Sequence, residues 1–198
     1  MVRTLGVIME YRAVGNRCAV DLQSLRLPIS HGEILELLRK KEFGLIEVDL
    51  VGLARDCIGA SKYRRGARLR DAPAIVDCSS FIKWLYGKRG IWLPRRSIQQ
   101  RELGQVVAPD DIIAGDVVFI SGRIDYHLDD PADGVGHVGI ATGDKTVIHA
   151  ANKKSGVIET PLGEFIERVK FRGARRYVAK DRVVSTFELP DGREIETA

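Results

Sequence analysis

Cysteine and histidine are the residues of this sequence whose types and positions could support nucleophilic chemistry. Cys78 follows Asp77, a good N-cap residue, and precedes Phe81, Ile82 and Leu85 at helical spacing, which predicts that Cys78 lies in the first turn of a helix. Unpaired backbone N–H groups and the helix dipole at such a position favour the thiolate, the form that attacks carbonyl groups. We therefore expect Cys78 to be the cysteine that iodoacetamide alkylates fastest at neutral pH.

Two of the four histidines flank a predicted β-hairpin. His137 begins the apolar run 138–140, His149 follows the run 147–148, and a turn signal occupies residues 142–145. Folding the chain at this turn brings the two imidazoles to the same end of the hairpin, opposite each other or one register step apart. A nucleophile needs a base, and the base needs a polar group that orients it. Cys78, His137 and His149 can fill these three roles.

The remaining cysteines give no metal site or disulfide framework. Three cysteines are an odd number, and no C-x-x-C pair occurs. Cys57 lies on the apolar stripe of a predicted helix and is expected to be a buried core residue. A metal site made of Cys78, His137 and His149 would lack any closely spaced ligand pair, so no metal or other cofactor is expected.

The elements that must position these residues change type along the chain. Helical patterns come first, and short β-type runs separated by Gly, Asp, Asn and Lys turns follow from residue 115 onward, which predicts an α+β fold. The first expected helix is opened by Ser30 and Glu33 at capping-box spacing, ahead of the apolar residues Ile34, Leu35, Leu37 and Leu38. The others are expected over 48–58, from 77–78 until Gly87 and Gly90 stop the helix, and around 162–169. The expected strands are 117–120, 138–140, 147–148, 157–158 and 176–179, with a terminal hairpin over 183–196 that turns at Asp191 and Gly192.

Composition restricts the classes of protein that this chain can form. With 198 residues, 44% hydrophobic and 29% charged, it can build one ordinary domain with an extension, and wholesale disorder is excluded. The net charge of +4 allows an anionic partner without requiring nucleic acid, and a monomer is expected. No apolar run long enough to span a bilayer occurs. Glu10 and Arg12 interrupt the first apolar stretch, so a cytoplasmic chain is expected, with secretion or delivery by a phage or as a toxin left open.

Five short motifs, in order and with matching spacing, resemble those of the NlpC-type (p60) papain-like cysteine peptidases. They are DCSSF at 77–81, LPRRS at 93–97 with Gln99 and Gln100, AGDVVF at 114–119, GHVGI at 136–140 and VIHA at 147–150. The resemblance covers roughly residues 45–180 and implies a papain-like fold, with N-terminal helices packed on a central antiparallel sheet. It divides the chain into an N-terminal extension (1–44), a catalytic domain (45–180) and a C-terminal hairpin or tail (181–198).

The resemblance also implies an activity. Members of this family hydrolyse amide bonds in peptidoglycan stem peptides, often the bond between D-γ-glutamate and a diamino acid. In this sequence the nucleophile would be Cys78, which forms a thioester, the general base and acid would be His137, and the orienting residue would be His149. An amidase, or an acyl or amide transferase in which an amine replaces water, is the alternative on the same scaffold.

The chain departs from the family pattern around the nucleophile. Ser80 stands where glycine is usual, the upstream Tyr-x-Trp-Gly-Gly element is reduced to Tyr63, Arg64, Arg65 and Gly66, and the stretch 121–135 is longer than the usual connection. Three residues, Tyr63, Asp77 and Ser79, are expected to support the oxyanion or bind substrate, together with backbone N–H groups at the helix start. Arg64 and Arg65 are expected to contact substrate carboxylates at the edge of the cleft.

Overall fold

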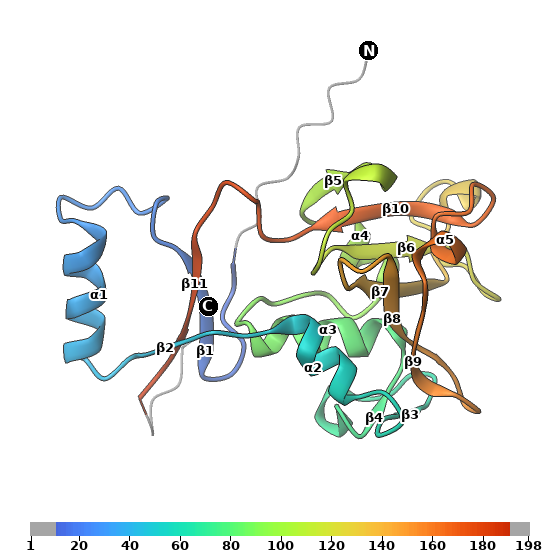
Figure 1. Ribbon diagram of the computed structural model, residues 1–198, viewed down its shortest axis with the longest axis horizontal. Helices are drawn as coiled ribbons and strands as arrows, with labels where there is room; N and C mark the ends of the chain where they lie inside the picture. Colours follow the sequence, from blue (N-terminus) through green and yellow to red (C-terminus); the bar gives the residue numbers. More distant parts are fainter. Residues whose placement is uncertain (1–10, 191–198) are drawn as a thin grey trace, which may run out of the picture. The chain divides into compact units, whose positions relative to one another are not determined.

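The computed structural model describes residues 11–190, which form two compact units (Figure 1). The first unit comprises Leu50–Leu85 and Pro94–Tyr177, and the second comprises residues 11–49, 86–93 and 178–190. Helices and antiparallel sheets both occur, which confirms the predicted α+β class. Within residues 11–190, no helix combines the length and the apolar character needed to cross a membrane.

A six-stranded antiparallel sheet forms the centre of the first unit. Its strand order is β5-β10-β6-β7-β8-β9, and every neighbouring pair is antiparallel. Its strands are β5 (Gln105–Val107), β6 (Val117–Ile120), β7 (His137–Ala141), β8 (Thr146–Asn152), β9 (Gly156–Pro161) and β10 (Phe171–Arg176). The predicted hairpin is confirmed as β7 and β8, which pair with Ile140 opposite Ile148.

Both faces of this sheet are covered by apolar side chains. On one face, Val118, Ala141, Val147 and Ala174 form a buried cluster with Phe165 of the short helix α5 (Leu162–Phe165). Side chains alternate along a strand, so the other face carries the intervening residues. These are Val117, Phe119, Val138, Ile140 and Ile148, all fully buried. A histidine at an odd-numbered position of β7 or β8 therefore points to the α5 side of the sheet.

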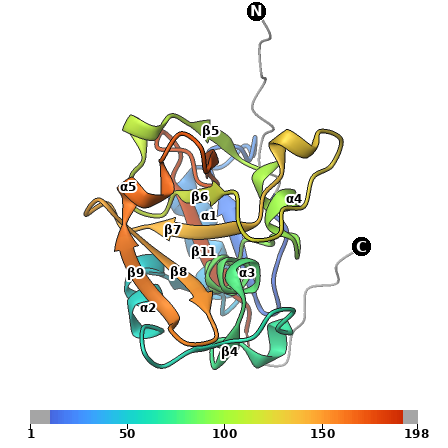
Figure 2. The same ribbon diagram turned by 90° about the vertical axis from the view of Figure 1, so that its right-hand side faces the viewer.

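The candidate nucleophile begins helix α3 (Cys78–Lys88). The elements before and after it in this unit are α2 (Leu50–Asp56), β3 (Lys62–Tyr63), β4 (Ile75–Val76) and α4 (Ser97–Arg101). The strands β3 and β4 pair in parallel, with Tyr63 next to Val76. In two views a quarter-turn apart, α3 lies alongside β7 and β8 (Figures 1 and 2). The nucleophile helix is therefore held next to the strand that carries His137.

Three predicted elements differ most from the structure in their bounds. The helix expected over 48–58 is shorter, and Cys57 lies just beyond its end, where it is buried as predicted. The helix expected over 162–169 ends at Phe165, and the strand expected at 176–179 is instead β10, which ends at Arg176. Val169 is 77% exposed, whereas Phe171 packs against the same core cluster as Phe165. The chain leaves the helix early because burial of Phe171 favours a strand there.

The second unit has a three-stranded sheet and one helix. Its elements are β1 (Arg17–Asp21), α1 (His31–Lys40), β2 (Gly44–Ile46) and β11 (Val184–Glu188), with strand order β1-β11-β2. The capping box at Ser30 is confirmed: its hydroxyl accepts the Glu33 N–H at 3.3 Å, and the Glu33 carboxylate accepts the Ser30 N–H at 2.7 Å. Leu22, Ile34 and Phe187 form the buried core of this unit.

The C-terminal hairpin is replaced by a different pairing. Strand β11 forms antiparallel ladders with β1 on one side and β2 on the other, so neither side is left for a hairpin partner. The expected turn at Asp191 and Gly192 lies outside the described residues. Sequence periodicity could not reveal this arrangement, because the partners of β11 are more than a hundred residues away in the chain. The proposed boundaries at residues 44/45 and 180/181 stay predictions.

Candidate active site

The start of helix α3 is held by reciprocal hydrogen bonds. Asp77 is its N-cap: the carboxylate accepts the Ser80 N–H at 2.8 Å, and the Asp77 N–H donates to the Ser80 hydroxyl at 2.8 Å. This is a capping box in which serine replaces the usual glutamate. Cys78 is consequently the first helical residue. The serine that departs from the family pattern thus helps to hold the helix end that carries the candidate nucleophile.

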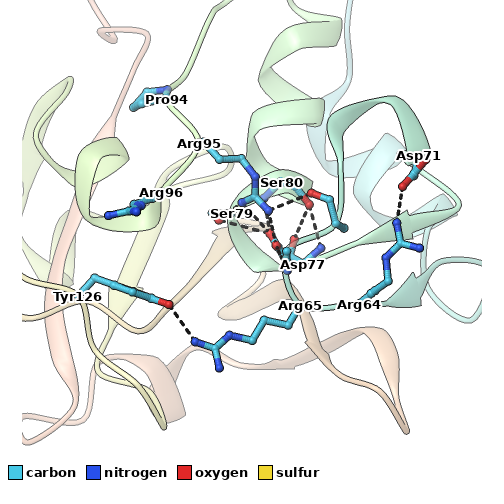
Figure 3. A network of polar contacts seen from close by, with 12 residues as sticks. Arg64, Arg65, Asp71, Asp77, Ser79, Ser80, Pro94, Arg95, Arg96 and Tyr126 are labelled. Carbon is cyan, nitrogen blue, oxygen red and sulfur yellow. Dashed lines mark hydrogen bonds and ion pairs between the residues drawn. The ribbon is translucent and has the colours of Figure 1, made fainter.

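Arg95 binds the same N-cap from a different segment. Its guanidinium forms an ion pair with the Asp77 carboxylate and donates to the Ser79 hydroxyl at 2.8 Å and to the Ala67 carbonyl at 2.9 Å (Figure 3). The Gly66 N–H also donates to Asp77, at 2.9 Å. Asp77 and Ser79 are therefore occupied by structural contacts. The LPRRS motif drew attention to the segment that contains Arg95. Spacing in the sequence did not reveal that Asp77 is its partner.

The thiol of Cys78 is less acidic than its helix position predicts. Burial of the sulfur and the negative charge of Asp77 raise the pKa of Cys78 to about 11. Hydrogen bonds from the backbone N–H groups of Ser79 and Val138, and the charge of Arg95, lower it by less. The expected thiolate is thus outweighed by desolvation, and the resting group is a thiol. The bond from Val138 also places the sulfur beside β7, one residue after His137.

His137 and His149 meet as the hairpin predicted. A hydrogen bond of 2.7 Å joins Nε2 of His137 to Nδ1 of His149, and the two rings lie edge to face. The second nitrogen of His149, Nε2, lies 3.3 Å from the Thr160 hydroxyl of β9. Phe165 packs its ring against both imidazoles, with centroids 6.0 and 5.0 Å away. Thr160 and Phe165 were not expected from the sequence, because they come from β9 and α5, which only the sheet order brings here.

The histidine pair is neutral at physiological pH. Burial, together with the neighbouring His149, lowers the pKa of His137 to about 3, and burial lowers the pKa of His149 to about 4. Because Nε2 of His137 is engaged with His149, Nδ1 is the ring nitrogen left to take up a proton. A neutral imidazole with a free ring nitrogen is suited to accept a proton.

Tyr63 lies close to the candidate nucleophile. Burial raises the pKa of its hydroxyl, as do the charges of Cys78 and Asp77, while Arg65 and Arg123 lower it. Its strand β3 pairs with β4, which leads directly into Asp77. The phenol is therefore close enough to the sulfur for the two groups to influence each other electrostatically.

The structure does not bring Arg64 and Arg65 together. Their side chains diverge (Figure 3): Arg64 forms an ion pair with Asp71, whereas Arg65 donates to the Tyr126 hydroxyl at 2.8 Å. Arg64 lines a separate arginine-rich cavity with Arg68 and Arg70, so only Arg65 shares the surroundings of Tyr63.

The histidines also border a cavity of about 540 Å³ on the α5 side of the sheet. Its polar lining comes from β7, β8, β9, α5 and the segment before β10, and includes His137, His149, Asn152, Thr160, Glu164 and Lys170. Among the described residues, no three His, Cys, Asp or Glu side chains are grouped to hold a metal ion.

These features define an α+β protein with a cysteine at a helix start next to a pair of histidines on an antiparallel sheet. The chain belongs to the NlpC/P60 family, whose model matches residues 60–176. The NlpC/P60 domain of the peptidoglycan hydrolase SagA has the same fold, with a TM-score of 0.51 and 24% identity over 65% of this chain and 96% of that one. The papain-like fold predicted from the motifs is therefore confirmed.

Three relatives carry names that describe activities. A probable endopeptidase of Corynebacterium glutamicum is 38% identical over 65% of this chain, which spans about half (52%) of that relative. The murein DD-endopeptidase/murein LD-carboxypeptidase of Escherichia coli is 27% identical over 86% of this chain and 79% of its own length. The γ-D-glutamyl-L-lysine dipeptidyl-peptidase of Bacillus cereus is 33% identical over 52% of this chain and 29% of its own.

Proposed function

We propose that this protein is a cysteine endopeptidase that hydrolyses amide bonds in peptidoglycan stem peptides through a thioester intermediate. The observation that carries the proposal is the placement of the Cys78 sulfur against the Val138 N–H of β7, one residue after His137, whose ring is hydrogen-bonded to His149 at 2.7 Å. Membership of the NlpC/P60 family and the names of the relatives support the same activity.

The first step starts from neutral partners. The Cys78 thiol transfers its proton to Nδ1 of His137 while the sulfur bonds to the carbonyl carbon of the substrate, and the carbonyl electron pair moves onto oxygen. Proton transfer accompanies attack because the raised pKa of the thiol and the lowered pKa of the imidazole disfavour a resting ion pair. The Tyr63 hydroxyl and backbone N–H groups at the start of α3 stabilise the oxyanion.

The second step returns the proton. The imidazolium of His137 protonates the leaving amine as the C–N bond breaks, which leaves a thioester on Cys78. His137 then takes a proton from water as the water oxygen bonds to the thioester carbon. When the C–S bond breaks, the imidazolium returns this proton to the sulfur, which releases the acid product and restores the thiol. Throughout these steps His149 orients the ring of His137 through their hydrogen bond, and Thr160 lies within hydrogen-bond distance of His149.

The bond between D-γ-glutamate and the diamino acid is the proposed target. The family resemblance favours it, and the name of the B. cereus relative describes a peptidase of a γ-D-glutamyl-L-lysine bond. The name of the E. coli relative describes D,D cleavage instead, which makes the D,D cross-link the second candidate bond.

Mass spectrometry of the products formed from purified muropeptides tests the proposal. We expect fragments cut after D-γ-glutamate, and no products with the variant Cys78→Ala. Cleavage at the D,D cross-link would correct the bond but keep the class of enzyme. Products joined to an added amine would identify a transferase. Unchanged muropeptides, with a folded protein, would refute the proposal.

A further inference from the structure

Two arginines near the candidate site share one tyrosine as their common contact. Arg65 donates to the Tyr126 hydroxyl at 2.8 Å, and the Arg96 guanidinium lies 5.6 Å from the centre of the Tyr126 ring. Figure 3 shows the two arginines approaching this tyrosine from different segments. A guanidinium over an aromatic face is weakly attracted to it. Tyr126 is therefore in contact with two positively charged side chains, one at its hydroxyl and one at its ring.

Arg65, Arg96 and Tyr126 each lie next to a segment that carries a residue of the candidate site. Arg96 directly follows Arg95, which binds the N-cap of the nucleophile helix. Arg65 lies two residues after Tyr63. The backbone of Tyr126 exchanges two hydrogen bonds with Val135, at 3.1 and 2.9 Å, and Val135 lies two residues before His137. The three side chains consequently lie where the segments that carry Tyr63, the Asp77 clamp and His137 converge.

The charges of Arg65 and Arg96 are not neutralised by carboxylates. None of the ion pairs among residues 11–190 includes either guanidinium. Three acidic residues of the same segments are engaged elsewhere: Asp77 binds Arg95, Asp125 accepts from Ser121 and Gly122, and Asp133 binds Arg101. Arg65, Arg96 and Tyr126 are all exposed. An anion arriving from solvent would find two guanidinium groups and one phenol hydroxyl able to donate to it.

We propose that Arg65, Arg96 and Tyr126 bind a free carboxylate of the peptide substrate close to the amide bond that Cys78 attacks. Guanidinium groups match the geometry of a carboxylate and donate two parallel hydrogen bonds to it, whereas a neutral carboxamide offers a single acceptor oxygen. The site thus selects stem peptides whose glutamyl carboxylate is free over those in which it is amidated. This inference rests on the proposed function and adds the charge preference of the same site.

Two stem peptides that differ only in this group, one with the free D-glutamyl carboxylate and one with the carboxamide, test the preference. We expect kcat/KM of the unaltered protein to be about three- to thirtyfold higher for the free carboxylate, as two exposed ionic contacts allow. The ratio should fall toward one in the double variant Arg65→Gln with Arg96→Gln, and it should also fall as salt is added. Equal cleavage of both peptides by the unaltered protein would overturn the inference and leave the proposed function standing. Cleavage of neither peptide would overturn both.

A matched control removes the same amount of charge nearby. Arg68 and Arg70 follow Arg65 in the same segment, are also exposed, and line the separate cavity with Arg64. The double variant Arg68→Gln with Arg70→Gln should keep the ratio of the unaltered protein. If the ratio of kcat/KM for the two peptides falls as far in this control as in the Arg65 and Arg96 double variant, the preference comes from overall charge and the inference is wrong.

Substitutions of Tyr126 separate its two contacts. Tyr126→Phe keeps the ring under Arg96 and frees Arg65, so most of the preference should remain, whereas Tyr126→Ala should reduce it. Calorimetry can measure how tightly each variant binds the two peptides when it also carries Cys78→Ala. This measurement requires no turnover, so it also tests variants that have lost activity. Equal binding of the two peptides to the Cys78→Ala protein with both arginines intact would contradict the inference.

Discussion

At the scale of single residues, the reactivity of Cys78 results from opposing influences. The helix start, two backbone N–H groups and Arg95 favour the thiolate, but burial and Asp77 favour the thiol and raise the pKa of Cys78 to about 11. A raised pKa means that the reactive thiolate is scarce at neutral pH and increases about tenfold with each unit of pH below that value.

The first prediction concerns alkylation of this cysteine. The rate at which iodoacetamide modifies Cys78 should rise steadily from pH 7 to pH 10 without a plateau, because the thiolate fraction keeps increasing across this range. Mass spectrometry of the labelled peptides measures the rate. Cys57, which is 4% exposed, should be modified more slowly and serves as the internal comparison. A rate that is already constant near pH 7 would mean that a thiolate is present at rest, as the helix position alone suggests.

The second prediction concerns the histidine pair. His137→Ala should reduce kcat by about as much as Cys78→Ala, several orders of magnitude, because the nucleophile and its base act as a unit. His149→Ala should cost less, and His149→Asn should recover part of the loss, since the burial that lowers the pKa of His149 to about 4 makes its role that of a neutral partner. Steady-state kinetics of the four variants decide this. Complete inactivation by His149→Asn would show that His149 does more than orient His137.

At the scale of elements, the close approach of β7 and β8 sets the position of His149. Gly139 of β7 leaves no room for a side chain: a methyl group there would lie 2.4 Å from Cγ1 of Val147 and 3.1 Å from Cβ of His149. Both neighbours belong to β8, an interior strand that pairs with β7 on one side and β9 on the other, so they cannot move freely. The absence of a side chain at this position allows the two histidines to meet.

The third prediction follows from this packing. Gly139→Ala should lower the free energy of unfolding by about 1–3 kcal/mol, the usual cost of overfilling a packed core, and should lower kcat by displacing His149. Gly163→Ala is the control, because nothing lies within 4 Å of a methyl group at that position. Denaturant titration and kinetics of both variants measure the two effects. Unchanged stability and kcat in Gly139→Ala would mean that β8 can shift without disturbing the site.

At the scale of the whole molecule, the described residues divide into two units with separate cores. The core of the second unit depends on β11, which is the middle strand between β1 and β2. Phe187 of β11 is 2% exposed and packs with Leu22 and Ile34. A protein built from units with their own cores can lose one of them before the other.

The fourth prediction tests this independence. Phe187→Ala should destabilise the second unit by about 3–5 kcal/mol, as is usual for removal of a buried aromatic ring. Hydrogen exchange should then speed up at 17–21 and 44–46, which pair with β11, and stay slow at 117–120 and 137–141. If protection falls equally in both regions, the two units unfold together and the prediction that they unfold independently is wrong.

The sequence by itself determined the candidate nucleophile, the histidine pair and the helix caps. These features depend on local patterns. Asp77 directly precedes an apolar helical pattern, and one histidine lies on each side of a tight turn, so both features can be recognised within a short stretch of sequence. The capping box at Ser30 was predictable for the same reason, as was the α+β class, which follows from the change of hydrophobic period along the chain.

Only the tertiary structure decided which distant groups surround these residues. The clamp of Arg95 on Asp77, the Thr160 contact of His149 and the placement of β11 between β1 and β2 all join segments that local patterns cannot relate. The pKa values of Cys78 and His137 depend on how far water is excluded from them, which is a property of the packed molecule. Side-chain types and short spacings are written in the sequence, whereas burial and long-range contacts exist only once the chain has folded.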